Sequence, residues 1–226
     1  MTGTNGFVGQ ALCKEAIARG INTSGTTRLR WELLPNVKNF VVGDINGATD
    51  WSIALKDCDV VIHLAARVHV MLDSADDPLN EFRKVNTVGT EHLARSAAAN
   101  GVKRFVYVSS VKVNGEETIE NEIYCEKSLP SPHDPYGISK WEAEQALQRV
   151  SEETGIEVVV VRTPLVYGAG VKGNFAQMIS VLKRGLPLPL ASVRNKRSLI
   201  YCWQFGRRLN IMCHSPCSGW TNIFSE

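Results

Sequence analysis

The sequence predicts a doubly wound α/β fold, in which helices cover both faces of a parallel sheet. Short β-branched runs alternate with longer amphipathic stretches along most of the 226 residues. The run from Val158 to Val161 is continuous rather than alternating, as expected for a strand that helices cover on both sides. A glycine-rich loop, Gly3 to Gly9, precedes the first amphipathic stretch.

The elements follow in a regular order. The glycine loop opens a helix at 9–19, and β-branched runs predict strands at 21–27, 40–42 and 60–64. A long amphipathic stretch predicts a helix at 78–100, before a strand at 104–109. An acidic segment with two prolines, 119–134, predicts a surface loop into a helix at 135–154. The valine-rich strand at 157–162 and a helix at 174–184 complete the pattern.

Composition places the chain among soluble globular proteins. It has 25 Lys+Arg against 23 Asp+Glu and 44% hydrophobic residues, which excludes disorder and collagen. A net charge of +2 gives no reason to expect nucleic acid or a membrane as a partner. The longest apolar stretch, 59–66, is too short to span a bilayer, and the start lacks a signal peptide, so we expect a cytoplasmic protein. The six cysteines show no CxxC spacing, which predicts free thiols, and we expect no metal site.

The glycine loop is a candidate phosphate site. Glycines let a backbone approach a pyrophosphate, and the helix that follows favours its charge. A glycine-rich turn packed against the sheet is the alternative. A dinucleotide site also requires a strand before the loop, where this sequence has only Met1 and Thr2. We therefore expect the sheet to lack its first strand, through a fragment or a misplaced start codon.

Tyr136 and Lys140 lie four residues apart on a predicted helix, so both project from one face. A solvated helix face is the alternative interpretation. Ser109 and Ser110 end a predicted strand, where α/β enzymes place functional groups. A nearby ammonium favours the tyrosine phenolate, which makes proton transfer feasible near neutral pH, and Ser110 could bind the reacting oxygen.

Seven motifs occur in order: Gly3-x-x-Gly6-Phe7-Val8-Gly9, Gly43-Asp44-Ile45, His63-Leu64-Ala65-Ala66, Asn86-x-x-Gly89-Thr90, Ser109-Ser110, Tyr136-x-x-x-Lys140 and Arg162-x-Pro164-x-Val166-Tyr167-Gly168. Over residues 1–201 the sequence resembles the extended short-chain dehydrogenase/reductases, in the nucleotide-sugar epimerase/dehydratase branch that includes UDP-glucose 4-epimerase. The resemblance implies a Rossmann-like NAD(P)-binding domain at 1–163 and an incomplete nucleotide-sugar-binding region at 164–201.

The resemblance also implies roles for single residues. The catalytic residues are Ser110, the base Tyr136, and Lys140, which tunes the base and binds the nicotinamide ribose. The other cofactor contacts are Gly3, Gly6, Phe7, Val8 and Gly9 at the pyrophosphate, Asp44 and Ile45 at the adenine, Leu64, Ala65, Ala66 and Asn86 along the cofactor, and Thr163 and Pro164 beside the nicotinamide.

Two departures from the family pattern bear on cofactor and reaction. NAD-selective members carry an acidic residue after the second strand, whereas this sequence has Arg28, which could pair with a 2′-phosphate or remain solvated. NAD and NADP therefore both stay open. The 4,6-dehydratases follow the catalytic hydroxyl with Asp-Glu, but Val111 and Lys112 follow Ser110 here, which argues against a dehydratase.

On the substrate side, Asn174 and Arg197 resemble positions that contact the nucleotide diphosphate. A solvated arginine is the alternative for Arg197. The resemblance ends at Tyr201, and the last 25 residues show little helical or strand period. Moving their codons one nucleotide forward permits a stop-free sequence that resembles a helix and then a strand. We therefore expect residues 202–226 to be an out-of-frame tail.

The expected function is that of an NAD(P)-dependent nucleotide-sugar epimerase acting by hydride transfer at a sugar carbon. The alternatives are a 4-ketoreductase of a UDP- or dTDP-deoxysugar and a non-catalytic dinucleotide-binding fragment. A short-chain dehydrogenase of small alcohols is disfavoured by the phosphate-side motifs. The expected partner is a nucleotide sugar, and the sequence leaves the oligomeric state open, with a homodimer as the candidate.

Overall fold

The fold is described from a computed structural model, which covers residues 1–32, 34–68, 76–118, 123–171, 173–185, 196–214 and 221–222. The elements in chain order are α1 (Phe7–Ala18), β1 (Ser24–Thr27), β2 (Lys38–Val41), α2 (Ser52–Leu55), β3 (Val60–His63), α3 (Pro78–Arg83), the π-helix η1 (Lys84–Val88), α4 (Gly89–Ala99), β4 (Arg104–Ser110), the 3₁₀ turn η2 (Val111–Val113), α5 (Pro135–Thr154), β5 (Glu157–Thr163), β6 (Leu165–Tyr167), α6 (Gly173–Lys183), β7 (Leu199–Tyr201), α7 (Cys202–His214) and β8 (Thr221–Asn222).

Every strand pair in these described residues is parallel. β1 pairs with β2, and β3, β4, β5 and β8 follow one another in a second run. Thr2 connects the two runs, because it forms single bridges to Thr26 on β1 and to His63 on β3. Its backbone N–H donates to the Ile62 carbonyl at 3.0 Å, and the Met1 carbonyl accepts from Thr26 at 2.8 Å. Residues 1–6 therefore contribute bridges rather than a strand.

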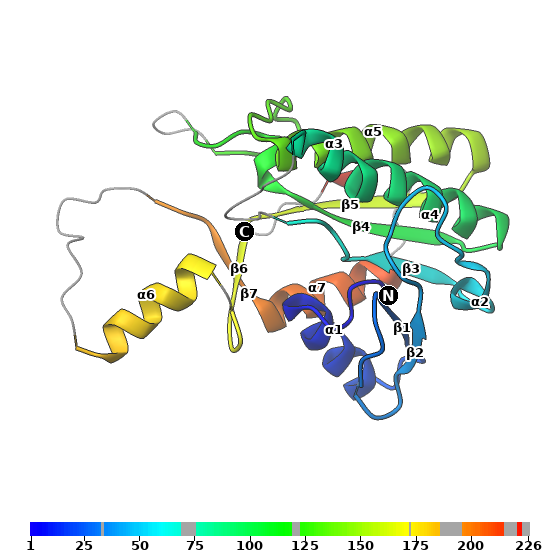
Figure 1. Ribbon diagram of the computed structural model, residues 1–226, viewed down its shortest axis with the longest axis horizontal. Helices are drawn as coiled ribbons and strands as arrows, with labels where there is room; N and C mark the ends of the chain where they lie inside the picture. The colour runs from blue at the N-terminus through cyan, green and yellow to red at the C-terminus, as the bar shows by residue number, and fades with distance from the viewer. Residues whose placement is uncertain are drawn as a thin grey trace.

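Helices lie on both faces of the sheet (Figure 1): α3, α4 and α5 on one side, α1 and α7 on the other. The valine run of β5 shows how the sequence produces these layers. Val158 and Val160 belong to the apolar cluster with α4 and α5, whereas Val159 and Val161 belong to the cluster with α1 and α7. Consecutive side chains of a strand point to opposite faces, so a strand covered on both sides is apolar at every position.

The helices on the α5 side were predicted unequally well. α5 runs over the predicted residues: Asp134 accepts the Gly137 N–H at its start, and Gly155 ends it with φ 76°. The helix predicted at 78–100 is present over 78–99, but it contains a π-turn, η1, between α3 and α4. A π-turn inserts an extra residue into the helical ladder, and hydrophobic period does not report such an insertion.

The expectation of little helical period after Tyr201 is wrong. Residues 202–214 form α7, which packs on α1 and buries side chains at helical spacing: Cys202, Phe205, Leu209 and Met212. β8 then extends the sheet beside β5. α2, β6 and β7 have no counterpart among the elements predicted from the sequence.

A second parallel pair, β6 with β7, lies beyond the carboxyl end of β5. The Tyr167 ring contacts Phe175 on α6 and Tyr201 on β7, with centroids 5.8 and 5.5 Å away. Figure 1 shows α6 away from the main sheet, past these two strands. Within the described part of the chain, no helix is long and apolar enough to span a lipid bilayer.

Candidate active site

Ser110 and Tyr136 meet at the carboxyl edge of the sheet. Ser110 ends β4, and Tyr136 lies in the first turn of α5. The Ser110 hydroxyl faces the phenol of Tyr136 and acts as a hydrogen-bond partner that lowers the phenol's pKa. Ser110 Oγ also accepts the backbone N–H of Lys112 at 3.2 Å, which holds the hydroxyl at the end of the strand. Two of the candidate catalytic groups are thus neighbours, although they come from different elements.

The start of α5 fixes the turn that carries Tyr136. Asp134 Oδ1 accepts the Gly137 N–H at 2.6 Å, and the Lys112 ammonium pairs with the same carboxylate. A Cβ at Gly137 would lie 2.9 Å from the Lys112 carbonyl oxygen, so glycine lets α5 approach this closely. Sequence reasoning missed Asp134, although Asp-Pro before a helix is a known start signal.

The charge state of Tyr136 differs from the expectation. Burial raises the pKa of Tyr136 to about 12, and the Asp134 carboxylate adds to this shift. The ammonium expected to favour the phenolate points elsewhere: Lys140 Nζ donates to the Val108 carbonyl at 2.7 Å and lies 4.2 Å from the centroid of the Tyr107 ring. The expected lowering of the Tyr136 pKa is therefore absent here, because burial outweighs the Ser110 hydrogen bond.

Lys140 is itself perturbed. Only 2% of the residue is exposed, and burial lowers the pKa of its ammonium to about 7. Glu144, one helical turn further along α5, acts in the opposite direction on this pKa. Near neutral pH the charge on Lys140 is consequently sensitive to small changes in its surroundings.

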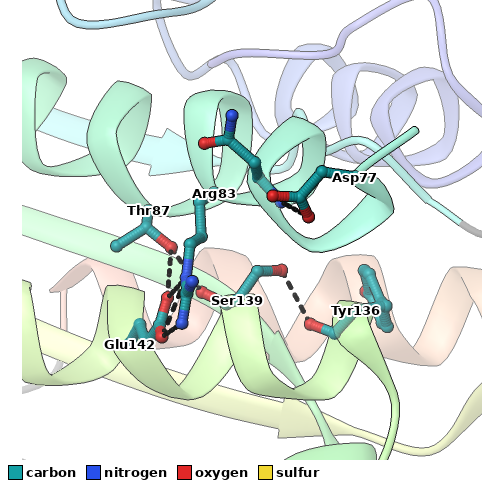
Figure 2. A network of polar contacts seen from close by, with 7 residues as sticks. Asp77, Arg83, Thr87, Tyr136, Ser139 and Glu142 are labelled. Atoms are coloured by element: carbon teal, nitrogen blue, oxygen red, sulfur yellow. Dashed lines mark hydrogen bonds and ion pairs between the residues drawn. The ribbon is translucent and has the colours of Figure 1, made fainter. Parts of the chain in front are cut away.

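Figure 2 shows a polar network that ties α3 and η1 to α5 next to Tyr136. The Arg83 guanidinium donates to the Glu142 carboxylate, with Nε to Oε2 at 2.8 Å. Thr87 Oγ1 donates to the Ser139 carbonyl at 3.0 Å, and Ser139 Oγ donates to the Tyr136 carbonyl at 2.8 Å. The backbone of the turn that carries Tyr136 is therefore held by Thr87 of η1 and by Ser139 of α5 itself.

Asn86 extends this network toward the candidate cofactor segment. Its amide nitrogen donates to Ser139 Oγ and to the Arg67 carbonyl, both at 3.0 Å, and its amide oxygen accepts the Arg67 N–H at 2.8 Å. The residue is 1% exposed and lies in η1. The structure thus places Asn86 as a brace between α5 and the segment that follows Ala66.

The glycine loop is a backbone cradle in front of α1. Gly3 has φ +67°, and its carbonyl accepts the Gly6 N–H at 2.9 Å. A Cβ at Gly9 would lie 2.2 Å from the Gly3 oxygen, and a Cβ at Gly3 would lie 3.0 Å from the Ala65 nitrogen. The loop closes only with glycine at these positions. Phe7 and Val8 open α1, whose first turn has no acidic residue, so the helix terminus suits an anion.

A buried histidine connects the cradle to the sheet. Thr2 Oγ1 accepts the N–H groups of Leu64 and Ala65, both at 3.1 Å, so its own hydrogen goes to His63 Nδ1 at 2.7 Å. His63 Nε2–H then donates to Thr90 Oγ1 at 3.0 Å. Burial lowers the pKa of His63 to about 3, which keeps the ring neutral. His63 opens one of the seven sequence motifs, but the motif alone does not predict this role.

The adenosine-side candidates lie beyond the ends of β1 and β2. Arg28 NH1 stands 3.7 Å from Asp44 Oδ1, and both side chains are exposed. Ile45 packs against the start of α4, because a Cβ at Gly89 would lie 2.6 Å from Ile45 Cγ2. Arg28 therefore has a carboxylate neighbour that sequence reasoning did not foresee.

The remaining candidates divide between two places. Thr163 pairs with Ser110 in the β4–β5 register, and the next residue, Pro164, is buried. Asn174 belongs to α6, but its side chain lies outside the described residues. Arg197 is exposed ahead of β7. The structure thus gathers the catalytic and nicotinamide-side candidates, whereas the two diphosphate candidates belong to the β6–α6–β7 part.

Where the chain is described, no group of three or more His, Cys, Asp and Glu side chains could hold a metal ion. The described cysteines, at positions 13, 58, 125, 202 and 213, are free thiols. Cys217 lies outside the described residues.

A parallel sheet with a glycine cradle before its first helix, and with Ser110, Tyr136 and Lys140 at its carboxyl edge, defines a dinucleotide-binding protein of the short-chain dehydrogenase/reductase type. Residues 1–205 match the NAD dependent epimerase/dehydratase family. The chain belongs to this family, and the Rossmann-type fold expected from its motifs is confirmed.

Curated relatives include a UDP-glucose 4-epimerase of Vibrio cholerae, 42% identical over 201 residues that cover 88% of this chain and 61% of the relative. An Escherichia coli O157:H7 protein named N-acetyl-alpha-D-glucosaminyl-diphospho-ditrans,octacis-undecaprenol 4-epimerase is 28% identical over 211 residues, covering 89% and 58%. The chain thus spans about three fifths of these relatives. The solved structure of MoeE5 with UDP-glucuronic acid and NAD superposes with a TM-score of 0.83 at 25% identity, covering 99% of this chain and 74% of MoeE5.

Proposed function

We propose that this chain binds NAD or NADP and epimerises a nucleotide sugar in the manner of a UDP-glucose 4-epimerase. The observation that carries the proposal is the pairing of Ser110 with Tyr136 at the sheet edge that also bears the glycine cradle, with Lys140 buried one turn further along α5. The names of the Vibrio cholerae and Escherichia coli relatives support a sugar 4-epimerase.

The fit to a dinucleotide rests on the cradle, where added Cβ atoms would collide with backbone. When bound, the nicotinamide supplies the acceptor and the donor of a hydride. The residues that would hold the cofactor are Gly3, Gly6, Phe7, Val8 and Gly9 for the pyrophosphate, Arg28, Asp44 and Ile45 for the adenosine side, and Leu64, Ala65, Ala66, Asn86, Tyr136, Lys140, Thr163 and Pro164 for the rest.

Tyr136 acts as the base on the sugar hydroxyl. As the carbon-bound hydrogen leaves as hydride, the hydroxyl proton moves to the Tyr136 oxygen, and both return in the second half, the hydride to the opposite face. Ser110 holds the reacting oxygen. Because burial raises the pKa of Tyr136 to about 12, the phenolate needs cationic charge beside it, which Lys140 provides when its ammonium moves from the Val108 carbonyl.

The proposal includes a domain division, with the dinucleotide-binding domain at 1–163, a nucleotide-sugar region at 164–201 that uses Asn174 and Arg197, and an out-of-frame tail at 202–226. It also includes a homodimer in the cytoplasm. Light scattering of the purified chain gives the mass that tests the dimer.

A 4-ketoreductase would use the same three catalytic residues. Elimination is disfavoured, because Lys112 follows the catalytic hydroxyl and pairs with Asp134.

The test is turnover by the purified chain. With NAD present, UDP-glucose or UDP-N-acetylglucosamine should convert to its C4 epimer, measured by NMR of the anomeric protons. Tyr136→Phe should lower kcat by about 10²–10⁴-fold while NAD affinity stays nearly unchanged, because only the ionisable oxygen is lost. Consumption of NADPH with a 4-keto sugar, without epimerisation, would favour the reductase. Wild-type kcat in the phenylalanine variant would remove Tyr136 from the mechanism.

A further inference from the structure

Two fully buried charges lie behind the candidate active site, and the mechanism above does not use them. Glu144 on α5 is 0% exposed and Arg162 on β5 is 2% exposed. Arg162 NH2 donates to Glu144 Oε2 at 2.6 Å, and Nε donates to Oε1 at 3.0 Å. Burying an ion pair costs desolvation energy that its attraction only partly returns, so the pair is weak evidence for stability alone.

The contacts of the pair lead directly to the catalytic residues. Ser109 Oγ donates to Glu144 Oε1 at 2.5 Å, and Ser109 is the backbone neighbour of Ser110. Glu144 lies one helical turn after Lys140 on α5. Arg162 immediately precedes Thr163, which is the register partner of Ser110. One carboxylate thereby joins α5 to the ends of β4 and β5.

We propose that Glu144, held by Arg162, is a positioning residue that fixes the register of Ser110 against α5 and acts through its charge on Lys140, one helical turn away. This inference rests on the proposed function for its catalytic meaning. The geometry itself, with a carboxylate of no exposed surface one helical turn from a buried lysine, belongs to the chain whatever its substrate.

The groups around Lys140 show why Glu144 has this influence. Neutral His63 faces it from β3, and the ring of Tyr107 faces it from β4. Tyr136 and Glu144 lie on its own helix, and Arg162 stands on β5 behind Glu144. Burial lowers the pKa of Lys140 to about 7, and Glu144 is the charge that opposes this shift. Loss of the carboxylate therefore lowers the pKa further.

Glu144→Gln is the central variant, because it keeps the shape and removes the charge. A cavity of about 200 Å³, bordered by Trp141, Glu144 and Arg162, gives Arg162 a route to water when its partner becomes neutral. Glu144→Asp keeps the charge and tests rescue. Glu153→Gln is the matched control, since it removes a carboxylate from the same helix, α5, and breaks an exposed ion pair with Arg95 of α4.

The primary readout needs no activity: the pKa of the Lys140 ammonium, followed by NMR of ¹⁵N-lysine-labelled chain and assigned with Lys140→Arg. We expect Glu144→Gln to lower this pKa by about one unit or more, with Glu144→Asp and Glu153→Gln close to wild type. The alkaline limb of the kcat/KM profile should shift to lower pH by the same amount. A pKa within about 0.3 unit of wild type in Glu144→Gln overturns the proposal, as does an equal shift in Glu153→Gln.

If Glu144→Gln does not fold, the double variant Glu144→Gln/Arg162→Met is used instead. It removes both charges, so that no unpaired guanidinium remains buried. The Lys140 pKa should still fall in this double variant, because Glu144 is the charge that raises it; an unchanged value overturns the proposal. The outcome for the proposed function is separate. Absence of turnover in the wild-type chain contradicts the proposed function, while the Lys140 titration still decides the role of Glu144.

Discussion

Arg28 faces outward beyond β1, with Asp44 as its neighbour across the strand ends. If a 2′-phosphate binds here, Arg28 supplies a charge-assisted hydrogen bond worth roughly 1.5–3 kcal/mol, and solvent exposure favours the lower figure. We expect Arg28→Ala to weaken NADP binding by that amount and to leave NAD binding unchanged. Fluorescence titration with both cofactors measures the effect.

Arg30→Ala is the control for Arg28, since it removes an exposed arginine two residues further along the same loop. Its NADP affinity should match wild type. Equal NADP affinity in Arg28→Ala and wild type would show that Arg28 contacts only Asp44 and solvent and does not bind the 2′-phosphate.

His63 gives the fold a dependence on acid. Burial lowers its folded pKa to about 3, below the unfolded value of 6.5, so the unfolded chain binds the proton first as pH falls. Stability from neutral His63 is therefore fully present above pH 6.5 and is lost toward pH 3, at up to about 1.4 kcal/mol per pH unit. In urea unfolding, His63→Gln should lose less stability than wild type between these limits.

His133 supplies the comparison for that experiment, because its side chain is exposed on the loop before α5. His133→Gln should keep the wild-type slope of stability against pH. The same slope in His63→Gln and in wild type would show that other groups cause the acid sensitivity.

At the scale of elements, the first turn of α5 combines a helix cap with an electrostatic effect on Tyr136. Asp134→Asn retains a side chain that caps well, and it removes the charge that raises the pKa of Tyr136. We expect the Tyr136 pKa to fall below about 12 in this variant while α5 remains formed. Spectrophotometric titration, with Tyr136→Phe as the reference, isolates this phenol.

Asp134→Ala removes the cap as well and should cost about 1 kcal/mol of unfolding free energy more than Asp134→Asn. Chemical denaturation of the two variants measures the difference. A Tyr136 pKa that stays at the wild-type value in both variants would show that Asp134 caps the helix without affecting the pKa of the phenol.

Elements whose signals are local were predictable from the sequence. α5 has Asp-Pro at its start and Gly155 at its end, and β5 has an unbroken valine run. The π-turn at Asn86 and the contact between Lys112 and Asp134 depend on packing between distant segments. The direction of Lys140 toward Val108 likewise follows from the burial of its site, which spacing along a helix does not report.

At the scale of the molecule, α7 completes the apolar layer on the α1 side of the sheet. Phe205 is 1% exposed and shares a cluster with Leu12 of α1. Phe205→Ala should lower the free energy of unfolding by about 3–5 kcal/mol. Ile211, on the same helix, is 49% exposed, and Ile211→Ala should change it by less than about 0.5 kcal/mol. Equal stabilities of the two variants in urea would show that α7 does not pack as described.

The hypothesis of a shifted frame after Tyr201 stays a prediction. Residues 202–214 form a packed helix as they stand, so helical period no longer supports the hypothesis. Re-sequencing the gene around the Tyr201 codon from an independent clone decides it. An unambiguous read in the present frame removes the hypothesis.

The parallel sheet has a consequence for the order in which the chain folds. Each strand of the described ranges pairs with a partner that lies beyond a crossover, so none of these pairs closes through a short hairpin. Closing such loops lowers the entropy of the chain before the stabilising contacts have formed. Folding is therefore slower than in a helical bundle, whose contacts are local. β4, α5 and β5 are long elements close together in the chain, so we expect them to associate first, bringing Ser110 to Tyr136. The glycine cradle joins the sheet through Thr2 and His63, which are separated by a longer stretch of chain. We therefore expect the cradle to form after the part of the site that holds Ser110 and Tyr136.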